Sequence, residues 1–385
     1  MRVLHVLSGK EKGGILRVIH AACDPIPPSV AEVAILLLGE TSAALPPGVR
    51  VLRPGGGGAT SWGKLGRVHS LIRGERFTLI HTHGSISNLY GWRLRLRMRG
   101  LTHLIQVHSH LSLILRETQK SRIKRALLLW GNRRALRTCD RVIAVSHSIR
   151  DELVQGGLAA SKITVIQNAV DLDELESRSR MPCALAASLD KGGEGTAVVG
   201  SVGRLSRVKN YRLLLEAARL VLRERPVTFV LVGDGPERAA LERAAGELGI
   251  AASVVFAGWV ENPYPLLRAF DVVALTSNSE GFPVVLAEAM GLERPIVATR
   301  VGGVEEIVRD GVCGEIIAPG DAGALARALL RLLGDPARRQ AFGRAGREIV
   351  ARDFSRASML GKLHAVYASM APDRSGAAGS RAVGP

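Results

Sequence analysis

Aromatic residues and cysteines are scarce in this chain, and long apolar runs are missing. Of 385 residues, phenylalanine, tryptophan and tyrosine make up 4%, and the four cysteines form no Cys-x-x-Cys pair. Widely spaced single cysteines exclude a zinc ribbon or a disulfide framework and fit a reducing compartment. No uninterrupted apolar run reaches the ~18–20 residues that a membrane-spanning helix needs. With a strand-like start and no small-residue cleavage site, the sequence predicts a cytoplasmic enzyme without a signal peptide.

Acidic residues are outnumbered, since 52 Lys and Arg face 35 Asp and Glu for a formal net charge of +17. Much of this charge lies between Trp92 and Arg141, opposed there only by Glu117 and Asp140. Nucleic acid is disfavoured as a partner because aromatic residues are only 4% of the chain and do not interleave regularly with the basic ones as stacking platforms would. Arg122–Leu136 mixes apolar and basic residues like a helix that lies on an anionic membrane. The cluster predicts either a solvated face or a peripheral contact with the inner face of the cell membrane.

Strand-like and helix-like stretches alternate along almost the whole chain. The strands are expected near Arg2–Ser8, Val30–Leu38, Val49–Arg53, Thr78–His83, His103–Ser109, Arg141–Ser146, Ile163–Gln167, Ala197–Val202, Val227–Val232, Ser253–Ala257, Asp271–Thr276, Pro295–Ala298 and Glu315–Ile317. This alternation is typical of parallel sheets with helical crossovers. One segment, Arg93–Arg99, alternates with period two like a strand, although its position calls for a helix. The polar stretch Asp171–Thr196 breaks the pattern and is interpreted as an inter-domain connection. We therefore predict an α/β protein with two doubly wound, Rossmann-like domains facing a cleft: residues 1–170, a connection 171–196, a second domain 197–355, a C-terminal helix 356–371 and a disordered tail 372–385.

Ligands of such folds bind at the carboxyl ends of the strands, so the motifs there are the candidate site. Gly13-Gly14 follows the first strand and would let backbone N–H groups approach an anion, although a tight turn explains two glycines equally well. Arg204 and Lys209 follow the first strand of the second domain. Lys209 stands before a helix that Asn210 is expected to cap, where its charge opposes the helix dipole. The two cations suit a diphosphate, and a solvated lysine is the alternative.

The most specific segment is TSNSEGFPVVLAEAM, residues 276–290. Gly281 allows a close turn, Pro283 suits the first turn of a helix, and the free N–H groups at that helix start would face an anion. Glu280 stands at the junction of strand and helix, and Glu288 lies eight positions later on the same side. The alternative for Glu280 is a plain cap or dipole partner.

Histidines form two i, i+2 pairs, His81 with His83 and His108 with His110. Each pair lies on one face of an expected strand, and two pairs on neighbouring strands could hold a metal for hydrolysis. No carboxylate accompanies either pair at ligand spacing, so the alternative is that they line an acceptor pocket or satisfy backbone groups.

Together, Gly13-Gly14, Gly203-Arg204 with Lys209, and SEGFPVVLAEAM resemble the retaining glycosyltransferases of family 4, which have the GT-B fold. The strings VIAVSHSIRDEL, VIQNAVDLDEL, LVGDGPERAALE and GGVEEIVRDGVCGEIIAPGD support the resemblance. HTHG and HSH are similar to members that build bacterial exopolysaccharide, capsule or lipopolysaccharide. The resemblance implies that a sugar is transferred, with retention at its anomeric carbon, to a hydroxyl of a glycan or lipid-linked acceptor. The donor would be a nucleoside-diphosphate-sugar, with UDP favoured as the nucleotide and GDP second.

The resemblance also implies that no cofactor or metal is required. Metal-dependent transferases need an Asp-x-Asp ligand set, and here Asp171-Leu172-Asp173 lies in the expected connection. Two alternatives keep the same fold, a non-catalytic nucleotide-sugar-binding protein and a nucleotide-sugar epimerase. A metal-dependent hydrolase built on the histidine pairs is the alternative from another class.

Residue roles follow from the same resemblance. Arg204 and Lys209 would hold the diphosphate, and Glu288 would accept hydrogen bonds from the ribose. Glu280 and His108 would contact the sugar as the catalytic residues, with Glu280 positioning the sugar rather than attacking it. The common pattern has Gly after the lysine, where this chain has Asn210. The other residues expected to bind the sugar donor are Gly14, Val260, Gly281, Phe282, Pro283 and Val284.

Overall fold

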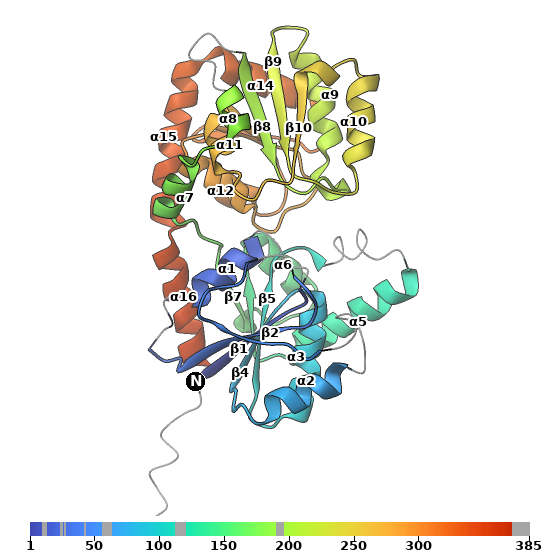
Figure 1. The fold of residues 1–385 in the computed structure, drawn as a ribbon, viewed down its shortest axis with the longest axis vertical. Coiled ribbons are helices and arrows are strands. Elements are labelled where there is room, and N and C mark those ends of the chain that lie inside the picture. Colours follow the sequence, from blue (N-terminus) through green and yellow to red (C-terminus); the bar gives the residue numbers. More distant parts are fainter. Residues whose placement is uncertain are drawn as a thin grey trace, which may run out of the picture.

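The computed structural model describes residues 1–9, 14–23, 26, 28–41, 44–55, 64–111, 121–189 and 196–371. Two parallel sheets, one above the other in Figure 1, carry helices on their faces. Gly13 and the expected tail 372–385 lie outside the described residues. Among the helices that are described, none combines the length and the apolar character needed to span a bilayer.

The first sheet has seven strands in the order β3-β2-β1-β4-β5-β6-β7. Every one lies where the sequence predicts a strand: β1 (Arg2–Leu7), β2 (Glu32–Leu37), β3 (Arg50–Leu52), β4 (Leu79–His83), β5 (Thr102–Val107), β6 (Arg141–Ala144) and β7 (Ile163–Val165). Alternate residues of β1 belong to different cores, because Val3 and Leu7 pack on one face and Leu4 and Val6 on the other. Burial on both faces is why these strands are rich in apolar residues.

Helices cover both faces of this sheet: α1 (Gly14–Cys23), α2 (Lys64–Arg73), α3 (Ser85–Arg97), α5 (Arg122–Thr138), α6 (His147–Gln155) and the 3₁₀ turn η1 (Ala160–Lys162). Residues 93–97 of the period-two segment Arg93–Arg99 lie in α3, which ends at Arg97, so the place of the segment between β4 and β5 decides its structure. A leucine in that run, Leu94, is fully buried against the sheet. Tertiary position overrides local pattern here.

The second sheet has six strands in the order β10-β9-β8-β11-β12-β13. All were expected: β8 (Ala197–Val202), β9 (Val227–Val232), β10 (Val254–Gly258), β11 (Val272–Leu275), β12 (Ile296–Thr299) and β13 (Gly314–Ile317). Its helices and turns are η2 (Arg207–Lys209), α9 (Tyr211–Val221), α10 (Arg238–Glu247), η3 (Ala251–Ser253), α11 (Tyr264–Ala269), α12 (Val284–Gly291), α13 (Val304–Ile307), α14 (Ala322–Gly334) and α15 (Pro336–Asp353). Both sheets therefore present their carboxyl ends, and the loops after them, as sites for ligands.

Two chain segments join the halves. The stretch interpreted as a connection contains two helices, α7 (Leu172–Ser179) and α8 (Ala184–Leu189), and both pack on α11 of the second half. The last helix, α16 (Arg356–Ser369), returns to the first sheet and packs beside α1 (Figure 1). Backbone pairing of Val170 with Ser355 holds the two crossings side by side. The domain boundaries given above stay a prediction.

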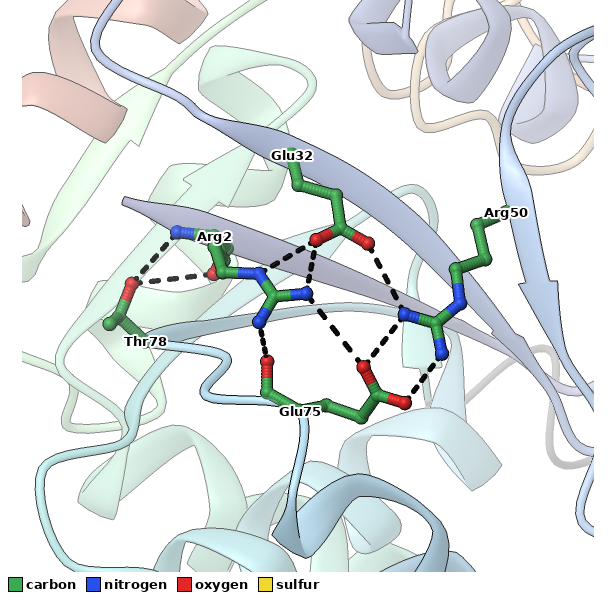
Figure 2. A network of polar contacts seen from close by, with 5 residues as sticks. All are labelled: Arg2, Glu32, Arg50, Glu75 and Thr78. Carbon is green, nitrogen blue, oxygen red and sulfur yellow. Dashed lines mark hydrogen bonds and ion pairs between the residues drawn. The ribbon is translucent and has the colours of Figure 1, made fainter.

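At the amino end of the first sheet, four charged side chains form one network, shown in Figure 2. Arg2 of β1 donates to Glu32 of β2 (Nε···Oε2 2.7 Å) and also bonds Glu75, in the loop before β4. Arg50 of β3 donates to Glu75 (Nη1···Oε2 2.7 Å). The network ties four segments together at the end of the sheet away from the candidate site, so we assign it to stability.

Candidate active site

Lys209 and Glu280 form an ion pair where β8 and β11 end. Lys209 Nζ lies 2.6 Å from Glu280 Oε1, and Ser277 Oγ donates to the same oxygen at 2.5 Å. The Glu280 side chain is 9% exposed and that of Lys209 25%. A carboxylate so deeply buried needs a cation and hydrogen bonds to balance its lost hydration. The pair therefore explains a lysine before a helix, because Glu280 offsets the unfavourable dipole.

Asn210 does not cap α9, and this corrects the expectation from the sequence. Its backbone is left-handed (φ 46°, ψ 49°), and its side chain donates to Asn278 Oδ1 at 3.2 Å instead of bonding the helix. Left-handed backbone is open to glycine and, among the other residues, most readily to asparagine. The conformation thus explains how Asn can replace the Gly of the common pattern.

Three glycines let the segments after β5, β11 and β12 touch through their backbones. A Cβ on Gly281 would lie 2.2 Å from the carbonyl oxygen of His108, and one on Gly303 would lie 2.2 Å from that of Gly281. At Gly302, with φ +49°, it would lie 1.8 Å from the Glu280 carbonyl oxygen. Such distances are impossible for real side chains. Glycine therefore brings His108 of the first half against the Glu280-Gly281 turn of the second.

Helix α12 begins directly after this turn, with Pro283 as its N-cap residue. In the part of the chain that the structure describes, no acceptor is found for the backbone N–H groups of Gly281, Phe282 and Val284. Pro283 itself has no backbone N–H group to donate. The ring of Phe282 packs edge-on against Phe354, 5.5 Å between centroids. Unengaged N–H groups at a helix start attract an anion.

Glu288 lies within α12 and is 3% exposed. Tyr264, at the start of α11, donates to its Oε1 at 3.3 Å. Sequence reasoning missed Tyr264, although its place between Pro263 and Pro265 signals a helix start near the end of β10. Trp259, in the loop between β10 and α11, is 64% exposed, and Val260 beside it is half-buried.

The remaining expected site residues are placed less closely. Arg204 is exposed after β8, and among the described residues no hydrogen bond or ion pair engages it. Gly14 is the first residue of α1. Within the described residues, no hydrogen bond or ion pair joins Arg204 or Val260 to the Lys209–Glu280 pair. The structure therefore gathers Lys209, Glu280, Gly281 and His108, and leaves the others at the ends of neighbouring strands.

The two histidine pairs do not form one four-histidine site. His83 Nδ1 lies 3.1 Å from His108 Nε2, but His110 instead pairs with Glu152 of α6. The Glu152 carboxylate raises the pKa of His110. Another histidine, His5 of β1, lies beside His81 and His83, and the sequence reasoning missed it. The register of β1 beside β4 pairs His5 with His81.

The possible ligand atoms of His5, His81 and His83 lie within 4.8 Å of one another, which is the geometric signature of a metal site. However, His5 Nδ1 and His83 Nε2 are 2.9 Å apart and bond each other. Two nitrogens on a tetrahedral zinc ion would be roughly 3.3 Å apart or more. Burial lowers the pKa of His5 to about 4 and that of His108 to about 3. The cluster is better described as neutral, mutually hydrogen-bonded rings.

Comparison with known proteins agrees with this geometry. The family model "Glycosyl transferases group 1" matches residues 190–349, and "Glycosyltransferase Family 4" matches residues 17–174. The 2-deoxystreptamine glucosyltransferase of Streptomyces kanamyceticus is 32% identical over 280 residues, 71% of this chain and 72% of that protein. The lipopolysaccharide core biosynthesis glycosyltransferase LpsE of Rhizobium meliloti (strain 1021) is 35% identical over 170 residues, 44% of this chain and 49% of its own.

Among solved structures, Anabaena HepE in complex with UDP-glucose superposes with a TM-score of 0.80 at 23% identity, covering 96% of this chain and all of that one. Two parallel Rossmann-like sheets, of seven and six strands, make this a GT-B fold. The chain belongs to glycosyltransferase family 4. The family, the fold and the class of enzyme predicted from the motifs are thereby confirmed.

Proposed function

We propose that this enzyme transfers a hexose, with retention and without a metal, from a UDP-sugar to a hydroxyl of a glycan or lipid-linked acceptor in cell-surface polysaccharide synthesis. The observation that carries the proposal is the Lys209–Glu280 pair beside the unengaged amides that open α12. The UDP-glucose bound by HepE and the lipopolysaccharide role of LpsE support the choice of donor and pathway.

The diphosphate would be held by cations and backbone rather than by a metal. Arg204 is exposed, Lys209 is a quarter exposed, and the amides of Gly281 and Val284 have no acceptor among the described residues. Together they stabilise the charge that grows on the leaving nucleoside diphosphate. Asp171, the first residue of the Asp171-Leu172-Asp173 motif, instead caps α7 and bonds Arg356 (3.3 Å). This supports a metal-independent reaction.

Glu280 and His108 would then meet the sugar. When phosphate draws Lys209 away, the Glu280 carboxylate is left to accept hydrogen bonds from sugar hydroxyls, with Ser277 still holding it. The bond from the anomeric carbon to phosphate breaks, the acceptor oxygen bonds that carbon from the same face, and the β-phosphate oxygen takes the acceptor proton. No protein base is required, so Glu280 orients the sugar and does not attack it.

The nucleoside would lie over the loop after β10. Glu288 is oriented by Tyr264 and would accept hydrogen bonds from the ribose hydroxyls. Trp259 and Val260 offer an exposed aromatic and apolar surface on which a base can stack. Gly14, at the start of α1, would close on the phosphates from the first half.

A lipid-linked acceptor would be reached at α5, which projects from the flank of the first sheet in Figure 1. Ile123, Leu127 and Trp130 follow one another at i, i+4 and i+7 and are 74%, 62% and 63% exposed. Exposed basic residues of the same helix surround this apolar stripe: Arg122, Lys124, Arg133, Arg134 and Arg137. Such a face suits an anionic bilayer. Sedimentation with anionic vesicles at low salt should deplete the wild type and spare Leu127→Glu, and no sedimentation would refute the contact.

The function itself is tested by donor turnover across UDP-, GDP- and ADP-sugars in EDTA. We expect one nucleotide sugar to be used, with EDTA without effect, and Lys209→Ala and Glu288→Ala to lose at least tenfold in kcat/KM. Lys362→Ala, an exposed lysine of α16, is the matched control and should behave as wild type. A failure to use any donor, or abolition by EDTA, would refute the proposal. Detection of a covalent glycosyl–Glu280 adduct would refute its positioning role.

A further inference from the structure

A line of hydrogen bonds runs from the C-terminal helix through the first sheet to the cleft. The Tyr367 hydroxyl bonds His5 Nε2 at 3.3 Å, and His5 Nδ1 bonds His83 Nε2 at 2.9 Å. His83 Nδ1 in turn bonds His108 Nε2 at 3.1 Å. Tyr367, His5 and His83 are fully buried, and the reaction proposed above uses only His108. Three buried polar side chains therefore lack a role.

The rings meet edge to edge, as good hydrogen bonds require. The centroids of His5 and His83 are 5.2 Å apart with 11° between planes, and those of His83 and His108 are 5.4 Å apart with 35°. Each separation nearly equals the hydrogen-bond length plus the two ring radii, so the nitrogens point along the line of centroids. Both contacts are in-line hydrogen bonds rather than stacked rings.

A neutral imidazole has one N–H, so it donates on one side and accepts on the other. Burial lowers the pKa of His5, His83 and His108 and keeps these rings neutral near pH 7. Every hydrogen bond of the line must then point in the same direction. The nitrogen that holds the proton on His108 is consequently decided at the other end, beside Tyr367.

At that end, Tyr367 also bonds His81 Nδ1 at 2.9 Å. His81 Nε2 and Gln106 Oε1 are buried and, among the described residues, have no hydrogen-bond partner. Gln106 stands opposite His83 in the register of β5 beside β4, so it shares a sheet face with His81, where the two unsatisfied atoms can pair with each other. An amide oxygen only accepts, which places the His81 proton on Nε2. His81 Nδ1 then accepts from Tyr367, whose oxygen accepts from His5.

We infer that Tyr367, acting through His5 and His83, holds the His108 proton on Nε2 and leaves Nδ1 as an acceptor for a hydroxyl of the donor sugar. Only that last contact rests on the proposed function. His108 touches the sugar, whereas Tyr367, His5 and His83 are positioning residues. The line gives the helix that returns from the second half a direct influence on the cleft.

Ring nitrogen NMR of the ligand-free, ¹⁵N-histidine-labelled enzyme tests the inference without any substrate. The His108 signals are assigned by their loss in His108→Asn. We expect a protonated Nε2 and an unprotonated Nδ1 in the wild type, and a mixture of both tautomers in Tyr367→Phe. A wild-type His108 with its proton on Nδ1, or a spectrum that Tyr367→Phe leaves unchanged, would overturn the inference.

Kinetics then separate positioning from general destabilisation. Tyr367→Phe should lower kcat about tenfold with the donor KM within about twofold. Tyr90→Phe, which removes another buried tyrosine hydroxyl of the first half, should have no effect.

His108→Asn keeps an acceptor near the Nδ1 position but removes the Nε2 that bonds His83, so adding Tyr367→Phe to it should cost no further activity. An equal loss in both backgrounds would show a merely structural role. If no variant transfers sugar, the proposed function fails while the NMR result still decides the tautomer.

Discussion

Replacing Gly281 by alanine should open the cleft without unfolding the protein. The added Cβ would lie 2.2 Å from the His108 carbonyl oxygen and 3.1 Å from Ser109 Cα, whereas ordinary contact begins at 3.4 Å. Backbone must therefore retreat by about 1 Å. Inside a packed core such strain costs roughly 1–3 kcal/mol, but here two domains can separate and relieve it.

Misplacement of reacting groups by about 1 Å can cost about a hundredfold in rate, and we expect kcat/KM to fall by that factor. The melting temperature should change little, and small-angle scattering should show a more open particle. Gly246→Ala is the control, because a Cβ there meets nothing within 4 Å in helix α10 and should stabilise the helix slightly. A Gly281→Ala enzyme with wild-type kcat/KM and unchanged scattering would refute the close-contact reasoning.

Three further predictions concern charge. Lys209→Met leaves the buried Glu280 carboxylate without its cation and should lower the free energy of unfolding by roughly 1–3 kcal/mol. Chemical denaturation measures this loss, and an unchanged free energy of unfolding would contradict the importance of the pair. Because Glu152 raises the pKa of His110, the pair stabilises the fold fully below the unfolded histidine pKa and loses this as pH rises through the folded value; His110→Gln should therefore lower the melting temperature more at pH 5.5 than at pH 9, and equal losses would contradict this. Arg2→Ala, which breaks the network of Figure 2, should lower the melting temperature by roughly 2–4 °C with unchanged donor affinity, so a weakened affinity would point to an unforeseen link with the cleft.

The fold could be predicted almost completely from the sequence because its signals are local. Strands such as Val227–Val232 are apolar at every position but Thr228, since helices cover both faces of a parallel sheet. Two segments have a structure that their local sequence pattern does not indicate. Arg93–Arg99 alternates like a strand but continues a helix, and the polar stretch before β8 contains α7 and α8 because their few apolar residues find partners on α11.

The candidate site was predictable where its residues lie close in the sequence. Glu280, Gly281 and Glu288 share one strand–turn–helix unit, so a single motif reports them. The pairing of Glu280 with Lys209 and the left-handed backbone of Asn210 depend on how neighbouring strand ends meet, which spacing alone does not encode. Tyr264 was missed for the same reason, because only packing brings α11 against α12.

The histidines show most clearly where local pattern stops being informative. Two i, i+2 pairs left open a four-histidine metal site as an alternative, yet the register of β1 beside β4 adds His5, and the turn after β5 sends His110 toward α6. Tyr367 enters from a helix more than two hundred and fifty residues away, with a hydroxyl 2.9 Å from His81. The same rings that suggest a metal centre in the sequence are, once neutral and aligned, a means of fixing one proton. Whether a buried histidine cluster binds an ion or orients a substrate is therefore decided by hydrogen-bond geometry and burial, because both require the same residues at the same spacing.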